Sequence, residues 1–415
     1  MSNKDTYLAR PIQIGQRTAP NRFVINAMEC CDGDAEGNVT QKSLDRYKRL
    51  FAGQAGVVFF ESITVQYDSR ARDMQLSLQP NNMHNIQGLA NLIKECKKIN
   101  PNTLLIVQLN HSGEVSGDEF SERVCVKPLY GFGGKVIDAE YVDKTIEQFI
   151  EASKILYDIG ADGVDLKFCH GYFGSQILRP YNDRNWKYGG PWENRRRFAF
   201  DMVEGVRKAV NDPKFLVGSK VSMYEGIPGG QGTAGPDTPV MDLTESLDLC
   251  KGLYERGANF ILQSAGAPPT ARKLHMPDSA KPDDCYFHMT MAKILKDNMD
   301  PNMVIMGSAY SVLNDGHNHL QGVCPEWNNL FHWGNYNIEH NYVDMVAIGR
   351  QSLADPFLPQ KYLEDRESEI NWCKACNACG ELINRQCNGG CIVYNKEYRD
   401  ILIASRKKFE FHLPY

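Results

Sequence analysis

The feature that most constrains the fold of this 415-residue chain is a regular alternation of short apolar runs with longer helical patterns. Segment 143–160 is one such helical pattern, with apolar positions at helical spacing and a glycine at its end. The apolar runs are residues 22–28, 56–62, 103–110, 163–168, 215–222, 259–265, 302–309 and 344–350. Near-continuous apolar strands are typical of a parallel sheet buried on both faces. The pattern therefore predicts an α/β fold, a (β/α)8 barrel.

A doubly wound parallel sheet is the main alternative to the barrel. That fold is favoured when G-x-G-x-x-G follows a strand, and none of the apolar runs is followed by it. Because the runs end near residue 350, we expect a barrel domain over 1–365. A small cysteine-rich segment over 366–415 would follow it.

Composition narrows the possible partners and the compartment. The net charge of −5 provides no general basic surface, so we expect no nucleic-acid partner. Residues 1–20 lack the apolar core of a secretion signal, and no window approaches the ~20 apolar residues of a membrane helix. We expect a soluble, cytoplasmic protein without a membrane partner. In that reducing compartment, clustered cysteines indicate metal ligands rather than disulfides.

Polar residues near the carboxyl ends of the predicted strands are candidates for the site, because barrel enzymes carry their chemistry there. This rule selects Glu29, Cys30, Ser62, Gln108, Asn110, Lys167, His170, Tyr172, Lys220, Gln263, Gly307, Gly349 and Arg350.

Several motifs occur in an order that resembles one family. Segment Cys169–Phe198 contains "HGY", "L-x-P-x-x-N-x-R" and "Y-G-G-x-x-E-N-R-x-R-F", and "NRFVINAM", "VQLNHSG" and "IGRQSLADP" lie elsewhere in the chain. Together they resemble the old yellow enzyme family of flavin oxidoreductases. The most similar subgroup is the iron–sulfur flavoenzymes, which include 2,4-dienoyl-CoA reductase, 2-enoate reductase and trimethylamine dehydrogenase. The resemblance implies an FMN-binding barrel followed by a [4Fe-4S] cluster.

The resemblance assigns cofactor roles to residues at the strand ends. An FMN phosphate needs N–H donors and a cation, which the loops after the last two strands can supply. Lys220 would place positive charge near flavin N1 and O2, although the family usually has arginine there. Gln108 would bind the pyrimidine edge of the flavin. The expected cofactor-binding residues are Ala27, Met28, Glu29, Ser62, Gln108, Lys220, Gly307, Ser308, Gly349 and Arg350.

Three residues after the fourth strand are the expected catalytic group. Lys167 and His170 occupy the positions of a family His/Asn pair that holds the substrate carbonyl. Tyr172 matches the family tyrosine that donates a proton, and a phenol with a pKa near 10 suits an enolate-like carbon. Dienoyl-CoA reductases also have a histidine after the sixth strand; His275 lies farther along this chain, and we leave it outside the predicted site.

A cysteine cluster near the C-terminus fits C-x2-C-x2-C-x11-C. Its expected iron ligands are Cys373, Cys376, Cys379 and Cys391, with Cys387 as a competitor for the fourth position. Zinc prefers two separated C-x2-C-like pairs, whereas three clustered cysteines and a distant fourth suit a [4Fe-4S] cluster. Zinc remains the alternative.

These expectations define a hypothesis for function. The protein would reduce an activated C=C bond of an enoate, enoyl-CoA or enone such as a ketosteroid, in an anaerobic metabolism. Hydride would come from FMN N5 and a proton from Tyr172. Three-domain relatives continue with FAD- and NAD(P)-binding domains, and no dinucleotide fingerprint occurs here. Electrons would therefore come through the cluster from a separate donor protein, or directly from NAD(P)H. We also expect a homo-oligomer.

Two alternatives belong to other classes. The first is an amine dehydrogenase or demethylase that passes electrons outward through FMN and the cluster. The lysine at position 167 disfavours a cationic amine, whereas Glu29 favours one. The second alternative is a zinc-stabilised barrel without catalytic activity.

Overall fold

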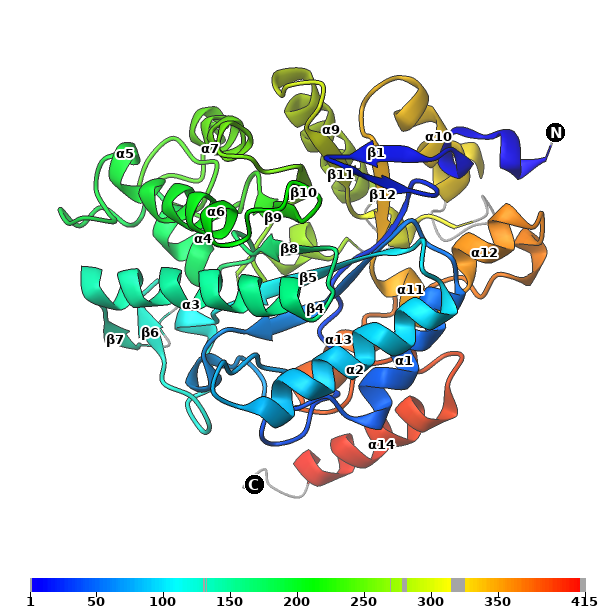
Figure 1. The fold of residues 1–415 in the computed structure, drawn as a ribbon, viewed down its shortest axis with the longest axis horizontal. Coiled ribbons are helices and arrows are strands. Elements are labelled where there is room, and N and C mark those ends of the chain that lie inside the picture. The colour runs from blue at the N-terminus through cyan, green and yellow to red at the C-terminus, as the bar shows by residue number, and fades with distance from the viewer. Residues whose placement is uncertain are drawn as a thin grey trace.

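A closed barrel of eight parallel strands forms the centre of the computed structural model, with helices around it (Figure 1). The structure describes residues 2–129, 131, 133–268, 270–277, 282–314 and 325–410. The strands follow the order β10-β11-β12-β3-β4-β5-β8-β9 around the barrel. Each predicted apolar run coincides with one of these strands, although β4 extends two residues beyond its run, so the predicted (β/α)8 barrel is confirmed.

The barrel strands are β3 (Phe23–Ile25), β4 (Val57–Thr64), β5 (Leu104–Asn110), β8 (Gly163–Leu166), β9 (Leu216–Ser222), β10 (Phe260–Ser264), β11 (Val304–Gly307) and β12 (Met345–Ile348). The helices that alternate with them are α1 (Gln41–Ala52), α2 (Met83–Ile99), α3 (Ala139–Asp158), α6 (Arg197–Ala209), α7 (Thr244–Glu255), α9 (Pro282–Asn298), α10 (Leu330–Glu339), α11 (Arg350–Ala354) and α12 (Leu358–Leu363). Additional elements are β1 (Ile12–Ile14), β2 (Arg17–Ala19), β6 (Val124–Cys125), β7 (Lys135–Val136), α4 (Phe173–Leu178), α5 (Trp192–Arg195), α8 (Arg272–His275), α13 (Ala378–Asn384) and α14 (Lys396–Glu410).

Side-chain alternation along the strands separates two apolar cores. One face of each strand packs against the surrounding helices, where Val107 and Val164 lie. The other face fills the barrel, where Ile106, Leu262 and Met306 pack together with the β1–β2 hairpin. Because side chains alternate with a period of two, polar residues farther along the inward face form a layer at the carboxyl ends of the strands.

Local signals in the sequence explain where helices begin. The side chain of Thr40 accepts a hydrogen bond from the backbone of Ser43 at the start of α1, and Asp138 caps α3 in the same way through Tyr141. Such caps satisfy amide groups that have no partner inside the helix.

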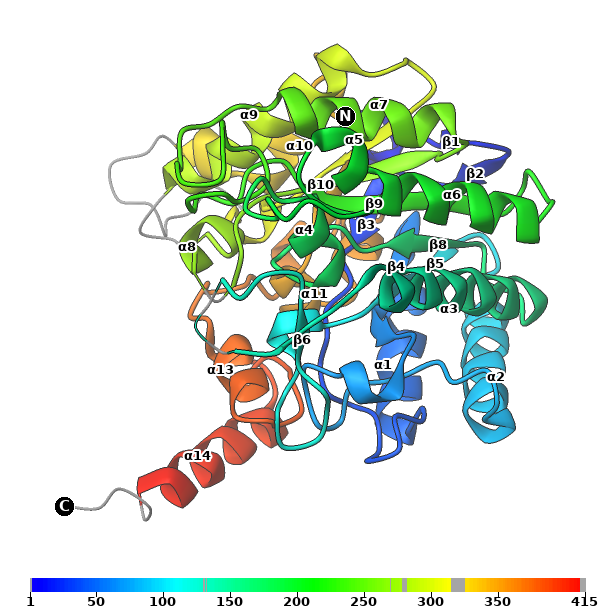
Figure 2. The ribbon, with the colours of Figure 1, turned by 90° about the vertical axis from the view of Figure 1, so that its left-hand side faces the viewer.

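The C-terminal segment lies along one side of the barrel, with α13 against it and α14 extending away (Figure 2). The division of the chain at residue 365 stays a prediction. None of the helices in the described part of the chain has the length and apolar character needed to cross a membrane.

A buried ion pair fixes the loop after β9, residues 225–239, which is rich in glycine and proline, to the end of α4. Arg179 Nε donates to Glu225 Oε2 at 2.7 Å, and both side chains are almost fully buried. The same carboxylate accepts from the Ser175 hydroxyl and the Gln231 backbone. The conformation of the loop therefore depends on the buried Glu225 carboxylate.

Replacement of this arginine should destabilise the protein strongly. Arg179→Met would leave the Glu225 carboxylate buried without its cation, at a cost of about 3–5 kcal/mol in the free energy of unfolding. Urea denaturation would measure this loss. Lys154→Met, which breaks the exposed pair with Asp158, should cost less than about 1 kcal/mol. Equal losses in the two variants would contradict this role for the buried pair.

Candidate active site

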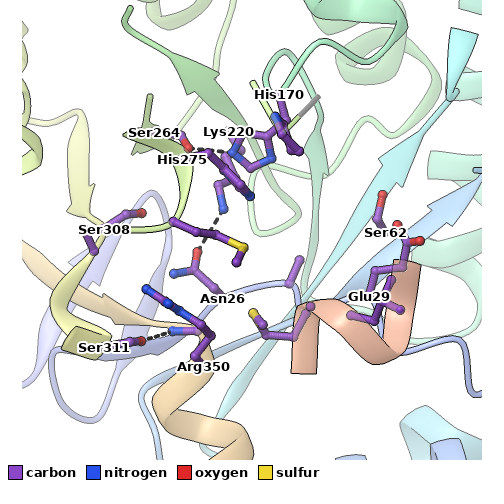
Figure 3. Close-up of a pocket in the computed structure, with 18 of the residues that line it drawn as sticks. Asn26, Glu29, Ser62, His170, Lys220, Ser264, His275, Ser308, Ser311 and Arg350 are labelled. Carbon is purple, nitrogen blue, oxygen red and sulfur yellow. Dashed lines mark hydrogen bonds between the residues drawn. The ribbon is translucent and has the colours of Figure 1, made fainter. Parts of the chain in front are cut away.

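A cavity of about 390 Å³ opens at the carboxyl ends of the barrel strands (Figure 3). Its lining includes all three predicted catalytic residues and most of the predicted cofactor-binding residues. Those present are Ala27, Met28, Glu29, Ser62, Gln108, Lys167, His170, Tyr172, Lys220, Ser308, Gly349 and Arg350. Gly307 ends β11 and does not line the cavity. The barrel thus brings together residues from distant parts of the sequence.

The floor of the cavity contains a lysine and an amide linked through a buried carboxylate. Gln108 Nε2 donates to Asp165 Oδ2 at 2.6 Å, and the backbone N–H of Lys220 donates to Asp165 Oδ1 at 2.6 Å. Burial raises the pKa of the Asp165 carboxyl to about 6. Burial likewise lowers the pKa of the Lys220 ammonium, which contacts Asn26 Oδ1 at 3.3 Å.

Lys167 and Tyr172 form the centre of the predicted catalytic group. The Lys167 ammonium lies 3.5 Å from the centroid of the Tyr172 ring and donates to the Ser62 hydroxyl at 3.0 Å. Burial lowers the pKa of Lys167, and the positive charge of Lys220 lowers it further. Burial and the nearby Glu29 carboxylate raise the pKa of the Tyr172 phenol, which therefore stays protonated at neutral pH.

His170 is held in a fixed orientation by hydrogen bonds from two strands. Its backbone has a φ of 65°, which is uncommon for a residue with a side chain. The backbone N–H donates to the Ser222 hydroxyl at 3.2 Å, and Nε2 lies 2.7 Å from the Ser264 hydroxyl. His275 packs edge-on against the ring at 3.9 Å between centroids. Burial holds the pKa of both imidazoles well below the usual value, so both are neutral at physiological pH.

Glu29 lies on the opposite side of the cavity from His170 and Lys220 (Figure 3). Its Oε2 accepts from Gln75 at 3.4 Å, while Oε1 is buried without a hydrogen-bond partner. Arg72 Nε is 3.9 Å from Oε1 and is also unsatisfied. This acid–base pair is therefore loose, and a polar group of a ligand could bind to either member.

A third side of the cavity carries Ser308, Ser311 and Arg350 (Figure 3). The Ser308 hydroxyl is buried without a partner. A side chain in place of Gly349 would come within 2.9 Å of the Met28 sulfur, so the backbone there approaches its neighbour closely. Arg350 donates to Asn377 and to the Pro277 carbonyl. An unsatisfied hydroxyl beside a guanidinium suits a phosphate group.

Several lining residues were missed from the sequence. They are Asn26, Arg72, Ser264, Pro268, Arg272, His275, Met276, Pro277, His288, Ala309, Ser311, Gly380, Ile383 and Asn384. Ser264 follows Gln263, and strand alternation could have identified it. Gln263 itself does not line the cavity, and its Nε2 lies 3.2 Å from Nδ1 of the lining residue His288. The other missed residues reach the cavity through long-range packing, and no local pattern in the sequence indicates their position.

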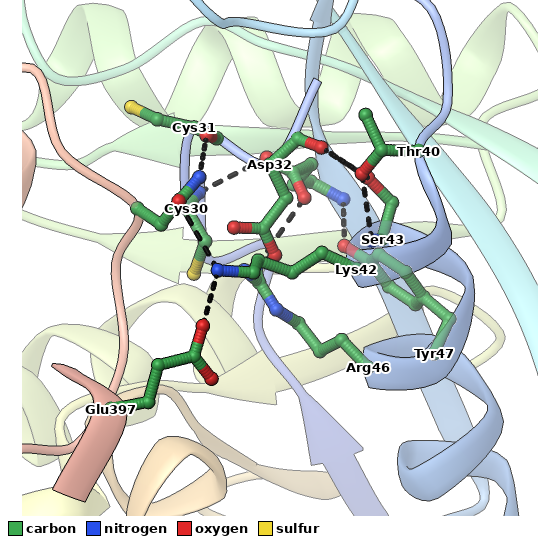
Figure 4. Close-up of polar contacts among 11 residues, drawn as sticks. Cys30, Cys31, Asp32, Thr40, Lys42, Ser43, Arg46, Tyr47 and Glu397 are labelled. Atoms are coloured by element: carbon green, nitrogen blue, oxygen red, sulfur yellow. Dashed lines mark hydrogen bonds and ion pairs between the residues drawn. The ribbon is translucent and has the colours of Figure 1, made fainter. Parts of the chain in front are cut away.

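The cysteine-rich segment forms one wall of the cavity through Gly380, Ile383 and Asn384 of α13. The loop after β3 holds this segment in place (Figure 4). The Cys30 carbonyl accepts from the Gly389 backbone at 2.7 Å, and the Cys31 carbonyl accepts from Asn388 Nδ2 at 2.6 Å. The same short loop, residues 26–32, also carries Met28 and Glu29 into the cavity.

A further salt bridge joins α1 to α14, because Lys42 pairs with Glu397 at 2.7 Å (Figure 4). Beneath it, the half-buried Arg46 pairs with the buried Asp32 and Glu61 carboxylates. Glu61 Oε2 in turn accepts from the Cys30 backbone at 3.0 Å. This network fixes the loop that contacts the cysteine-rich segment.

Electrostatic interactions connect the predicted iron ligands of this segment. Burial raises the pKa of the Cys373 thiol, with contributions from Cys391 and Cys376, and raises that of Cys379 to about 11. Cys387 instead donates to the Arg385 carbonyl at 3.4 Å and packs against Leu382. Among the described residues, no three His, Cys, Asp or Glu side chains are arranged to hold a metal ion.

Comparison with known proteins identifies the class. Residues 7–251, more than half of the chain, match the model of the NADH:flavin oxidoreductase / NADH oxidase family, to which this chain therefore belongs. It is a flavin oxidoreductase of the old yellow enzyme type, and family membership supports FMN as its cofactor.

Individual relatives differ in length. The chain is 23% identical over 395 residues to the NADH oxidase of Thermoanaerobacter brockii, covering 93% of this chain and 54% of that protein. It is 24% identical over 368 residues to the NADPH dehydrogenase of Bacillus subtilis (strain 168), covering 88% and 96%. The chain thus spans about half the length of the first relative and nearly all of the second.

Solved structures share the fold. A 2-naphthoyl-CoA reductase in complex with 2-naphthoyl-CoA aligns with a TM-score of 0.77 at 19% identity, covering 96% of this chain and 58% of that one. Histamine dehydrogenase from Rhizobium sp. 4-9 aligns with a TM-score of 0.73 at 21% identity, covering 94% and 52%.

Lys220→Met should raise the pKa of the Lys167 ammonium, because it removes a like charge from the same cavity. An NMR titration of 15N-labelled lysine ammonium groups would measure the change. Lys293→Met removes an exposed lysine that pairs with Asp297, and it should leave Lys167 unchanged. An unchanged or lower Lys167 pKa in Lys220→Met would contradict this electrostatic coupling.

Proposed function

We propose that this protein is an FMN- and [4Fe-4S]-dependent reductase of activated C=C bonds in enoates, enoyl-CoA thioesters or enones. The observation that carries the proposal is the arrangement of Lys167, His170 and Tyr172 around one cavity that also contains Gln108 and Lys220. Cations and neutral hydrogen-bonding groups face a protonated phenol, which is the combination that a conjugated carbonyl requires.

The residues of the cavity fit FMN. The unsatisfied Ser308 hydroxyl and the Arg350 guanidinium would hold the phosphate, and Gln108 and Lys220 would contact the pyrimidine ring. Ala27, Met28, Glu29 and Ser62 would border the ring system, and Gly349 would allow the backbone to approach it. When bound, FMN supplies hydride at N5.

The roles of the chain's own residues follow from their surroundings. Lys167 and His170 would bind the carbonyl oxygen of the substrate and stabilise negative charge that develops there. Both side chains are buried, so their hydrogen bonds and the charge of Lys167 interact with a ligand more strongly than in water. Tyr172 would protonate the α-carbon, and the raised pKa of its phenol keeps the proton available.

The four thiols Cys373, Cys376, Cys379 and Cys391 are the donor set that a [4Fe-4S] cluster needs. Cys391 is favoured as the fourth ligand because its thiol interacts electrostatically with Cys373, whereas the Cys387 thiol donates to the Arg385 carbonyl. A cluster there would supply one-electron transfer close to the cavity wall.

Electrons could come from two sources. Cys376 is exposed, so a separate donor protein could approach the cluster at that point. The direct source is NAD(P)H bound at the cavity, as the names of the NADH oxidase and NADPH dehydrogenase relatives suggest.

A second candidate function is the oxidation of an amine, and the unsatisfied Oε1 of Glu29 favours it. A carboxylate in the cavity would bind an ammonium group, and histamine dehydrogenase shares the fold. Lys167, Lys220 and Arg72 oppose a cationic ligand in the same space. We therefore rank C=C reduction first.

Tyr172→Phe should slow substrate reduction by about 10²–10⁴-fold, because the α-carbon loses its proton donor. Reduction of the flavin should stay unchanged. Anaerobic stopped-flow measurement of the two half-reactions with an α,β-unsaturated ketone would separate these effects. Tyr181→Phe, whose hydroxyl contacts the Pro128 carbonyl outside the cavity, should behave as wild type. Unchanged substrate reduction in Tyr172→Phe would rule out this proton donor.

Cys391→Ala should lose iron and sulfide, whereas Cys387→Ala should retain both. Anaerobic purification with iron, sulfide and zinc analysis would measure the metal content. Zinc without sulfide in the wild-type protein would exclude the cluster, and equal iron content in the two variants would exclude Cys391 as the fourth ligand.

A further inference from the structure

Three adjacent strands place the Asp165 carboxylate beneath the floor of the cavity. Gln108 on β5 is the direct neighbour of Asp165 on β8, and Asp165 is the neighbour of Gly218 on β9. Val164 and Leu166 face the outer helices, so Asp165 faces the barrel interior. Its side chain is completely buried, below the residues that line the cavity.

Both oxygens of this carboxylate have a defined donor. The Lys220 backbone N–H donates to Oδ1 at 2.6 Å, and Gln108 Nε2 donates to Oδ2 at 2.6 Å. The backbone donor cannot turn away, because β9 is paired with both of its neighbours in the barrel. The Lys220 backbone therefore fixes the position of the carboxylate. The other oxygen of that carboxylate then determines which group of the Gln108 amide must face it.

An ionised carboxylate only accepts hydrogen bonds. Gln108 must consequently turn its amide nitrogen toward Asp165, which leaves the amide oxygen for the cavity. The pyrimidine edge of a flavin carries an N3–H donor between two carbonyl acceptors. An outward amide oxygen matches that N3–H, whereas the flipped amide would place two donors against each other.

We propose that Asp165 is a positioning residue of the flavin site, which orients the Gln108 amide so that Oε1 accepts from the flavin N3–H. Asp165 does not touch the cofactor in this arrangement. The inference depends on FMN binding but not on the proposed substrate, so its failure would leave the proposed C=C reduction untouched.

Asp165→Asn tests the orientation directly. The oxygen of the asparagine amide would still accept from the Lys220 backbone N–H. The asparagine NH2 group would then face Gln108 and force the glutamine amide to flip. We expect FMN to bind about 10- to 100-fold more weakly to the FMN-free protein, because two donors then oppose each other. Fluorescence titration would measure the dissociation constant, and circular dichroism would establish that the variant folds. Wild-type affinity in Asp165→Asn would overturn the proposal.

A second substitution should restore binding. In Asp165→Asn/Gln108→Glu, one carboxylate oxygen at position 108 would accept from the amide introduced at position 165, and the other would accept from the flavin N3–H. The net charge equals that of the wild type, and we expect FMN affinity within about threefold of it, because no donor pair remains opposed. A merely structural role for Asp165 predicts no such rescue, so continued weak binding in the double variant would overturn the proposal.

A measurement on the wild-type holoenzyme does not depend on the folding of any variant. With 15N-labelled FMN, the N3–H proton should exchange slowly with solvent and show the downfield shift of a hydrogen bond. Gln108→Ala should abolish both properties. Exchange in the wild type as fast as in free FMN would overturn the proposal.

Discussion

Burial of charge at the mouth of the barrel is the constraint on which the site depends. Lys167, Lys220 and Asp165 are all removed from water, and burial is the largest influence on the pKa of each. Such groups are costly unless neighbours satisfy them. Their partners, Ser62, Asn26 and Gln108, come from three different strand ends or loops. The chemistry of the site therefore requires the complete barrel.

The loop after β3 is the second unifying element. Met28 and Glu29 face the cavity, while the next two carbonyls bind Asn388 and Gly389 of the cysteine-rich segment. The Arg46, Asp32 and Glu61 side chains fix this loop from below. A displacement of the cysteine-rich segment would therefore affect the cavity in two ways, directly through the α13 residues in its wall and through the loop that carries Met28 and Glu29.

The sequence predicted much of this architecture because its strongest patterns are local. Eight apolar runs specify the strands, and residues at strand ends, such as Gln108 and Lys220, follow from the barrel rule. The sequence indicated Gln263, whereas Ser264 lines the cavity. Neighbouring strand residues point to opposite faces, so an error of one position selects a side chain that faces away from the cavity. Arg72 lies on a loop and His275 ends the short helix α8; both reach the cavity through long-range packing, so no local pattern identifies them. The roles of the site residues remain predictions.

The α13 wall has a consequence for how proteins of this type could diversify. Gly380, Ile383 and Asn384 limit the same space as Tyr172 and His170, yet they belong to a segment that follows the last barrel strand. Shape selection for the ligand is therefore divided between two stretches of sequence that can vary separately. Exchange of the C-terminal segment alone would give a differently shaped compartment above an unaltered set of barrel side chains.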